Sequence, residues 1–149
     1  MFTPILRDAE PSRTPRGIIN VASAAAFGAA PGMAAYNVSK AGVLSLSETL
    51  AAELAGTAVR VTVLCPTFVK TNILESGRIS EQSNELAAKL MRWTGLSPDK
   101  VARICLDTHD RGELYCMPQF DAKIGWNVKR LAPQTYTRTA GLISRINLP

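Results

Sequence analysis

The 149-residue sequence predicts an α/β fold, a partial, doubly wound parallel sheet of about three strands with flanking helices. A short apolar segment, 17–23, and a segment rich in β-branched residues, 59–65, predict two strands. Between them, residues 36–55 repeat apolar side chains at spacings of three and four, which predicts an amphipathic helix. A strand, a helix and a strand of these lengths form a βαβ unit with parallel strands and a right-handed crossover.

The segment before the first strand, residues 1–16, predicts the end of a helix followed by a polar loop. Phe2, Ile5 and Leu6 carry the amphipathic pattern of that helix, and prolines interrupt the loop. After the first strand, residues 24–35 are rich in Ala, Gly and Pro, and they predict a second loop.

The central helix has one apolar stripe, formed by Val43, Leu46, Leu50 and Leu54. Gly56 is expected to end this helix, and Pro66 is expected to end the strand that follows. Residues 17–71 therefore make up the predicted βαβ unit.

The C-terminal half is expected to complete the fold around that unit. Residues 72–96 mix apolar and polar side chains and predict a lid over a substrate, with a helix over 81–93. Residues 97–149 predict a helix, a strand and a helix. Ser97 and Pro98 are the cap and the first residue of a helix that runs to about residue 110. A short strand over 113–118 and a terminal helix over 128–146 follow.

Three residues, Ser23, Tyr36 and Lys40, form a candidate proton-transfer site. A tyrosine and a lysine four residues apart on a helix share one face, so the phenol and the ammonium can meet there. Ser23 ends the first strand, and the helix leaves from the same edge. Residues 66–71 begin at the carboxyl end of the second strand, so all these groups converge on the edge where open α/β sheets bind ligands.

The chemistry of this site follows from the residue types. An adjacent ammonium favours the phenolate, so Lys40 is expected to make Tyr36 a better acid and base. Tyr36 would accept the proton of an alcohol during oxidation or give one to a carbonyl during reduction. Ser23 would hydrogen-bond the substrate oxygen and stabilise the charge that develops on it.

The chain resembles the short-chain dehydrogenase/reductase family in three places: Ser23, residues 36–40 (YNVSK) and residues 66–71 (PTFVKT). Members of this family transfer hydride between NAD(P) and alcohol or carbonyl substrates. The resemblance implies a Rossmann-like fold, NAD or NADP as the cofactor and a small-molecule alcohol or carbonyl as the substrate. It implies no choice between NAD and NADP.

The resemblance also implies a set of cofactor contacts. Lys40 would bind the nicotinamide ribose, and Val69 would contact the carboxamide through its backbone. Thr71 would lie near the cofactor amide or the phosphates, and Tyr36 and Pro66 would complete the set.

Two departures from the family pattern concern the cofactor. Thr67 stands where the family often has glycine, so the loop after the second strand is expected to differ. The sequence also lacks the family's Gly-rich TGxxxGxG turn and its Asn-Asn-Ala-Gly segment, and a helical Asn of the catalytic set would fall before residue 1. We therefore expect the chain to be the C-terminal catalytic portion of such an enzyme, inactive alone, with the first strand as an exposed sheet edge.

Composition and charge indicate where the protein is located and which binding partners it lacks. The chain is 46% hydrophobic and 19% charged, and it has neither an apolar run long enough to cross a bilayer nor a secretory signal, so we expect a cytoplasmic protein. Its three cysteines are expected to be free thiols, and the single His109 to lie at the surface or at a helix end, with no metal site. The net charge is +5, and residues 129–149 hold four basic residues and no acid; a solvated helix face is the favoured interpretation, and no motif indicates a nucleic-acid partner.

An alternative function remains open. Family members commonly form homo-oligomers through the helix at 36–55, and this helix has a face of small residues that suits close packing. The face comprises Ala41, Gly42, Ser45, Ala51 and Ala52. The chain could therefore be a non-enzymatic interaction protein that dimerises with full-length relatives.

Overall fold

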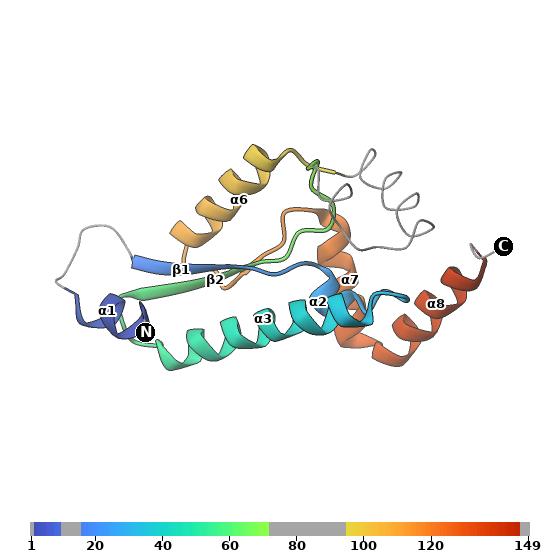
Figure 1. The fold of residues 1–149 in the computed structure, drawn as a ribbon, viewed down its shortest axis with the longest axis horizontal. Coiled ribbons are helices and arrows are strands. Elements are labelled where there is room, and N and C mark those ends of the chain that lie inside the picture. The colour runs from blue at the N-terminus through green and yellow to red at the C-terminus, as the bar shows by residue number, and fades with distance from the viewer. Residues whose placement is uncertain (1, 10–15, 72–94, 147–149) are drawn as a thin grey trace.

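A computed structural model describes residues 2–9, 16–71 and 95–146. The described strands are β1 (Arg16–Val21), β2 (Val59–Leu64) and β3 (Tyr115–Cys116). They form one parallel sheet in the order β1-β2-β3 (Figure 1). The register pairs Arg16 with Val59 and Val21 with Leu64. The α/β class and the three parallel strands that the sequence predicts are therefore confirmed.

Helices cover both faces of this sheet. Helix α3 (Ala34–Glu53) contacts β1 and β2 on one face, and helix α6 (Pro98–Asp110) contacts β2 and β3 on the other (Figure 1). Helix α3 is the crossover between the parallel strands β1 and β2, as the βαβ pattern predicts.

The core lies around β2, whose side chains alternate between the two helices. Val61 packs with residues of α3, and Leu64 packs with residues of α6. Val63 and Thr62 are fully buried on opposite faces. Because both faces of this central strand are covered, four of its six residues are apolar, and its β-branched residues made it recognisable in the sequence.

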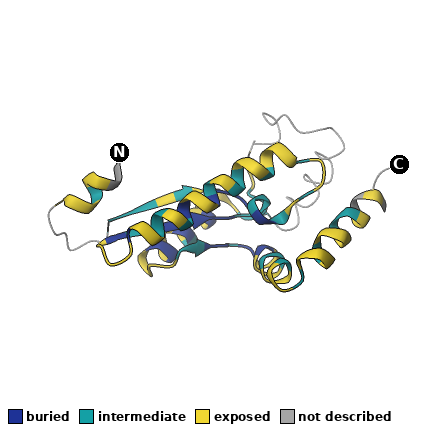
Figure 2. Cartoon of the chain, turned by 90° about the horizontal axis from the view of Figure 1, so that it is seen from below, coloured by how far each residue is buried: buried dark blue, intermediate teal, exposed yellow. Residues whose placement is uncertain are grey.

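Four further helices complete the described structure: α1 (Phe2–Asp8), α2 (Ala25–Gly28), α7 (Phe120–Leu131) and α8 (Pro133–Ile146). Figure 2 shows α8 extending from the body of the molecule with a largely exposed surface. None of the helices among the described residues is long and apolar enough to cross a membrane.

Two boundary predictions are wrong. The segment 24–35 is not all loop, because α2 lies within it and α3 begins at Ala34, two residues before Tyr36. The single terminal helix over 128–146 is instead two helices, with Ala132 between them in a non-helical conformation. Pro133 has no N–H to continue α7, so it starts a new helix, a position at which proline is favoured.

The other predicted helix ends agree with the structure to within a few residues. Helix α3 ends at Glu53, and Gly56 follows with a positive φ of 80°. The side chain of Ser97 accepts a hydrogen bond from Lys100 N, at 3.3 Å, and Pro98 opens α6 as expected. The helix predicted over 81–93 and most of the lid region 72–96 lie outside the described residues.

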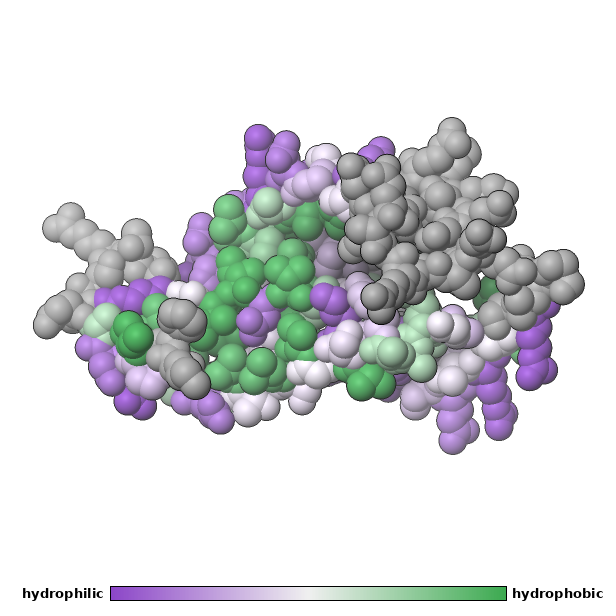
Figure 3. All heavy atoms as spheres, in the orientation of Figure 1, coloured by the Kyte–Doolittle hydropathy of each residue, from purple (hydrophilic) through white to green (hydrophobic). Residues whose placement is uncertain are grey.

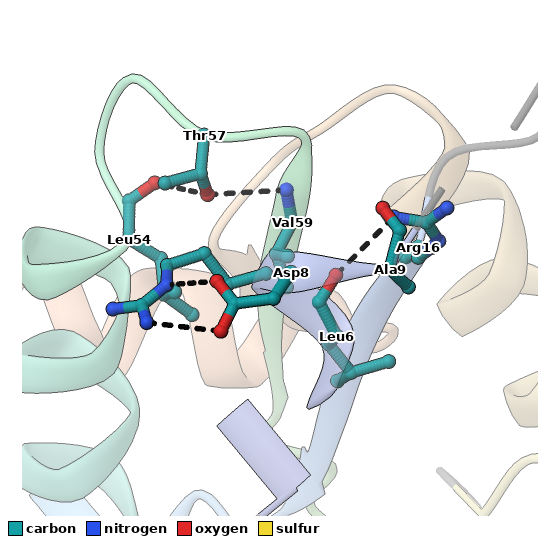
Figure 4. A network of polar contacts seen from close by, with 8 residues as sticks. Leu6, Asp8, Ala9, Arg16, Leu54, Thr57 and Val59 are labelled. Atoms are coloured by element: carbon teal, nitrogen blue, oxygen red, sulfur yellow. Dashed lines mark hydrogen bonds and ion pairs between the residues drawn. The ribbon is translucent and has the colours of Figure 1, made fainter. Parts of the chain in front are cut away.

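Helix α1 is tied to the start of the sheet by Arg16 (Figure 4). The Arg16 guanidinium donates to the carbonyl oxygens of Leu6, at 3.3 Å, and Ala9, at 2.8 Å. Nearby, Thr57 Oγ1 accepts from Val59 N and donates to Leu54 O, which fixes the turn between α3 and β2.

Strand β1 is an edge of the sheet within the described residues, as the sequence predicts. On its α6-facing side, Val21 is 58% exposed and Ile19 is also exposed. Figure 3 shows apolar side chains gathered on this face of the molecule, over β1 and between α3 and α6.

Candidate active site

Ser23 lies two residues beyond the end of β1 and is buried. Its Oγ accepts a hydrogen bond from Ala25 N, at 3.2 Å, where the chain turns into α2. A serine oxygen that accepts in this way keeps its own O–H as a donor. The hydroxyl can therefore still donate to a substrate oxygen.

Tyr36 and Lys40 lie in the first two turns of α3, on one face. The Lys40 ammonium lies 5.8 Å from the centroid of the Tyr36 ring, and it donates to Val21 O, at 3.2 Å. Lys40 thus reaches from α3 to the end of β1, two residues before Ser23. The Tyr36 side chain is 38% exposed, so a substrate can reach its phenol.

The segment 66–71 lies beside the Ser23 turn. Ala24 N donates to Pro66 O, at 2.9 Å, which joins the chain after β1 to the chain after β2. Further along, Val69 forms a parallel bridge with Leu96, through hydrogen bonds of Phe68 O and Lys70 N. In such a bridge the N–H and C=O of Val69 itself point away from Leu96. The Val69 O accepts from Thr71 N, at 2.8 Å.

The site contains two positioning residues that sequence analysis missed, Gln119 and Asp121. The buried Gln119 amide accepts from Thr67 N, at 3.2 Å, and donates to Phe68 O, at 2.7 Å. Thr67 Oγ1 donates to Asp121 Oδ1, at 3.2 Å. These contacts explain how threonine fits where the family often has glycine, since both its N–H and its hydroxyl have partners. The available signal in the sequence was an uncharged Gln directly after the strand predicted over 113–118, and only the structure shows that it is buried.

A second polar pair joins α3 to the sheet further along the helix. The Tyr115 hydroxyl donates to Glu48 Oε1, at 2.6 Å, and so joins β3 to α3. Burial, with the Glu48 carboxylate, raises the pKa of Tyr115. Tyr115 therefore remains a neutral donor, and this contact is structural.

Asn37, next to Tyr36, anchors the chain that precedes α3. Its Nδ2 donates to Ala30 O, at 2.9 Å. Its Oδ1 is buried without a hydrogen-bond partner among the described residues. A buried acceptor of this kind is costly to leave unpaired.

The donors around this edge fit the nicotinamide end of a dinucleotide. The Lys40 ammonium and the outward N–H of Val69 are donors of the kind that the sugar hydroxyls and the carboxamide oxygen of that group accept, while the Thr71 hydroxyl donates to Val69 O, at 3.4 Å. The described residues contain no Gly-rich turn after a first strand, which is the part that would hold the pyrophosphate.

The three cysteines and the single histidine have structural roles. Cys65, Cys105 and Cys116 are free, as predicted, and the structure shows that all three are buried. No group of three or more metal-ligating side chains occurs in the part of the chain that the structure describes. His109 lies in the last turn of α6, but it is buried rather than at the surface, and its Nδ1 lies 2.9 Å from Thr62 Oγ1.

Known proteins are similar in sequence to most of this chain. Residues 6–82 match the family model described as short chain dehydrogenase. The chain is 36% identical over 88 residues to human "Dehydrogenase/reductase SDR family member 4", a match that covers 58% of this chain and 32% of that protein. It is 35% identical over 114 residues to 1-deoxy-11-beta-hydroxypentalenate dehydrogenase of Streptomyces exfoliatus, which covers 72% of this chain and 40% of the relative.

Solved structures show the same relationship. A short chain dehydrogenase/reductase from Burkholderia phymatum, in complex with NAD, superposes with a TM-score of 0.74 at 26% identity, over 90% of this chain and 52% of that one. A short-chain dehydrogenase from Sphingobium yanoikuyae, in complex with NADPH, gives 0.62 at 27% identity, over 86% and 44%. The chain therefore spans about half the length of these structures and less of the curated relatives.

Proposed function

The chain belongs to the short-chain dehydrogenase/reductase family, and we propose that it carries the catalytic part of a site that moves hydride between NAD or NADP and an alcohol or carbonyl substrate. The observation that carries this proposal is the placement of the Lys40 ammonium, 5.8 Å from the Tyr36 ring and bonded to Val21 O beside Ser23. One helix and one strand end thus assemble a phenol, an ammonium and a hydroxyl.

In this proposal Tyr36 is the general acid and base. During reduction its hydroxyl gives a proton to the carbonyl oxygen, and during oxidation its phenolate takes the proton of the alcohol. The bound cofactor supplies or accepts the hydride at the substrate carbon. The Ser23 hydroxyl donates to the same substrate oxygen and stabilises its developing negative charge.

The cofactor contacts belong to Lys40 and the loop after β2. Lys40 would bind the ribose of the nicotinamide, and the Val69 backbone would bind the carboxamide, beside Pro66. Thr71 would lie near the amide or the phosphates, and Tyr36 would approach the ribose. Gln119 would act through the loop, since it holds Thr67 and Phe68 in place.

The adenosine and pyrophosphate would be held by residues outside the described fold, so we propose that the chain is inactive alone. Two assays side by side test both statements: one of the chain alone, which should show no activity, and one of a chimera with the cofactor-binding half of the Burkholderia phymatum relative followed by residues 16–146 of this chain. With NADH or NADPH and a panel of ketones, the chimera should oxidise the cofactor. Tyr36→Phe should lower the rate at least about 100-fold, since general acid catalysis contributes about 100- to 10,000-fold.

The matched control is Ser45→Ala, which changes an exposed hydroxyl on the same helix. It should leave the rate unchanged. A chimera that binds NADH but turns over equally well with Phe at position 36 would contradict the role of Tyr36.

A second candidate, pairing with another chain of the family through α3, is favoured by the outer face of that helix. Val38 is 72% exposed and Leu46 is 54% exposed. Between them, a side chain at Gly42 would meet nothing within 4 Å. Light scattering of the chain, alone and mixed with a full-length relative, should then show a dimer that Val38→Glu abolishes; a monomer in both samples would exclude it.

A further inference from the structure

The segment between Ser23 and Tyr36 is bonded to the C-terminal helices. Its first part is the short helix α2, which begins just after Ser23. Ser23 is bonded to that start twice, since its Oγ accepts from Ala25 N, at 3.2 Å, and its carbonyl oxygen accepts from Ala26 N, at 3.0 Å. A movement of α2 would therefore also move the Ser23 hydroxyl.

Two side chains of the C-terminal helices bind the other end of α2. Lys129 Nζ donates to Phe27 O, at 2.6 Å, and the Tyr136 hydroxyl donates to Gly28 O, at 3.0 Å. Phe27 and Gly28 are the last two residues of α2, and the last carbonyls of a helix have no partner within the helix. Burial raises the pKa of Tyr136, so its hydroxyl remains a neutral donor. The end of α2 is thus held by residues that lie 102 and 108 positions further along the chain.

The packing of α7 fixes the position of the Lys129 donor. Ala122, Trp126 and Lys129 are spaced by four and three residues, so they share one face of α7. Trp126 packs edge-on against the buried Phe27, with ring centroids 4.9 Å apart, and Ala122 is buried as well. The opposite face of α7 is exposed and comprises Phe120, Ile124, Val128 and Leu131. The face that carries Lys129 is therefore the one that contacts α2 (Figure 1).

The residue after α2 has a backbone conformation that depends on such contacts. Ala29 lies in the left-handed region, with φ 50° and ψ 44°. This region is unfavourable for a residue that has a Cβ atom, so the surrounding structure must hold it there. On its other side, Asn37 Nδ2 donates to Ala30 O, at 2.9 Å. The segment is therefore fixed at Ser23, at the end of α2 and beside Tyr36.

We propose that Lys129 and Tyr136 are positioning residues, which act through α2 to hold the Ser23 hydroxyl in place relative to the Tyr36 phenol. This inference rests on the proposed function, because it assigns a role in that same site. A shift of about 1 Å in a group that acts in the transition state can lower a rate about 100-fold. Loss of the two donors should lower kcat and change KM little, because the Ser23 hydroxyl stabilises charge that develops only during the reaction.

The first test uses the full chain without cofactor. Lys129→Met and Tyr136→Phe each remove one donor and keep the apolar part of the side chain. Hydrogen exchange of the Ala25 and Ala26 amides, followed by NMR, should be at least about fivefold faster in each variant than in the parent chain. Lys129→Arg keeps a donor and should exchange as the parent does. Unchanged exchange at both amides in both variants overturns the proposal.

Two control variants separate positioning from general stability. Lys123→Met changes an exposed lysine of the same helix and should alter neither the exchange rates nor the melting temperature. Thr57→Ala removes the hydroxyl that fixes the turn between α3 and β2, so it should lower the melting temperature and leave the exchange of Ala25 unchanged. Equal acceleration at Ala25 in Thr57→Ala would show a general loss of stability and would overturn the proposal.

The second test is a double-mutant cycle with Ser23 in the chimera described above. Lys129→Met with Tyr136→Phe should lower kcat at least about tenfold, and less than about twofold when Ser23→Ala is already present, because residues that act as a unit are not additive. The single variants replace the pair if it unfolds. An equal loss of kcat with and without Ser23→Ala overturns the positioning role. A chimera whose rate depends on neither Ser23 nor Tyr36 would instead refute the proposed function, and hydrogen exchange in the full chain would still decide whether the two donors hold α2.

Discussion

The Oε1 atom of Gln119 accepts a hydrogen bond from the backbone N–H of Thr67, at 3.2 Å, while its Nε2 donates to Phe68 O, at 2.7 Å. One side-chain amide thus pairs the two backbone groups just after β2, as a neighbouring strand would. Because Gln119 precedes α7, it links the loop of the candidate site to the C-terminal helices.

We first expect Gln119→Leu to destabilise the fold by about 1–3 kcal/mol, because it leaves the partly buried Thr67 N–H without its partner and removes one of the two hydrogen bonds to Phe68 O, which keeps the bond from Leu96 N. Urea unfolding measures this cost, and hydrogen exchange of the Thr67 amide should accelerate. Gln134→Leu, at an exposed position on α8, is the control and should change neither quantity. Unchanged protection of Thr67 in the Gln119 variant would contradict the contact.

A second prediction concerns the packing of His109 on Gly17. A Cβ atom at Gly17 would lie 2.0 Å from His109 Cε1 and 2.8 Å from Arg60 O. Gly17→Ala should therefore cost at least about 2 kcal/mol of unfolding free energy. Combining it with His109→Ala should recover part of that loss, which a double-mutant cycle measures.

The control for this pair is Gly42→Ala. Nothing lies near a Cβ atom at that helical position, so the substitution should stabilise the protein by about 0.5–1 kcal/mol. Additive effects of Gly17→Ala and His109→Ala would show that the two residues do not interact.

Third, the buried thiols should make stability fall in alkaline solution. Burial raises the pKa of Cys65 to about 12 and that of Cys105 to about 11, from 9.0 for an ordinary thiol. At a pH between the thiol pKa of the unfolded chain and the raised pKa of the native state, the unfolded chain releases thiol protons that the native state keeps. The unfolding free energy therefore decreases as the pH rises above about 9. Urea unfolding measures the unfolding free energy at about pH 8 and about pH 10. Its decrease between these two pH values should be smaller in the double variant Cys65→Ala with Cys105→Ala than in the parent chain.

The raised pKa values of the buried thiols also predict that they react slowly in the native chain. A neutral, buried thiol is a poor nucleophile, so a disulfide reagent should label the native chain slowly near pH 8 and label it rapidly in urea. Rapid labelling of Cys65 in the native state would contradict its burial.

Fourth, Lys40→Met should impair function more than stability. The substitution removes the ammonium but keeps the aliphatic stem, and the lost bond to Val21 O lies near solvent, so the melting temperature should change little. In the chimera described above, the rate of hydride transfer should fall at least about tenfold. Lys70→Met, in the exposed part of the loop, is the control and should retain the rate.

Fifth, NAD(H) and NADP(H) at millimolar concentration should raise the melting temperature of the chain alone by no more than about 1 °C. Stabilisation by a ligand depends on its affinity, and the described residues supply contacts only for the nicotinamide end. A shift of several degrees would show that these contacts suffice for binding.

Sequence analysis located the elements with regular patterns well. The strands β1 and β2 and the helix α3 were predictable because alternation, β-branching and apolar spacing are local properties. The break at Ala132 was missed because residues 128–146 were predicted as one helix, although Pro133 marked the start of α8. The candidate residues Ser23, Tyr36 and Lys40 were proposed from the spacing of a few polar residues and from resemblance to a family, and their catalytic role stays a prediction.

The sequence by itself determined the βαβ unit and the sheet edge at which its candidate residues gather, because strand direction and helix periodicity follow from local order. Only the tertiary structure decided that Gln119 holds the loop at Thr67, that His109 requires glycine at position 17, and that α7 turns its apolar face outward. These contacts join residues that are far apart in the chain. No local pattern encodes them, since each depends on where a second element lies once the core around β2 has formed.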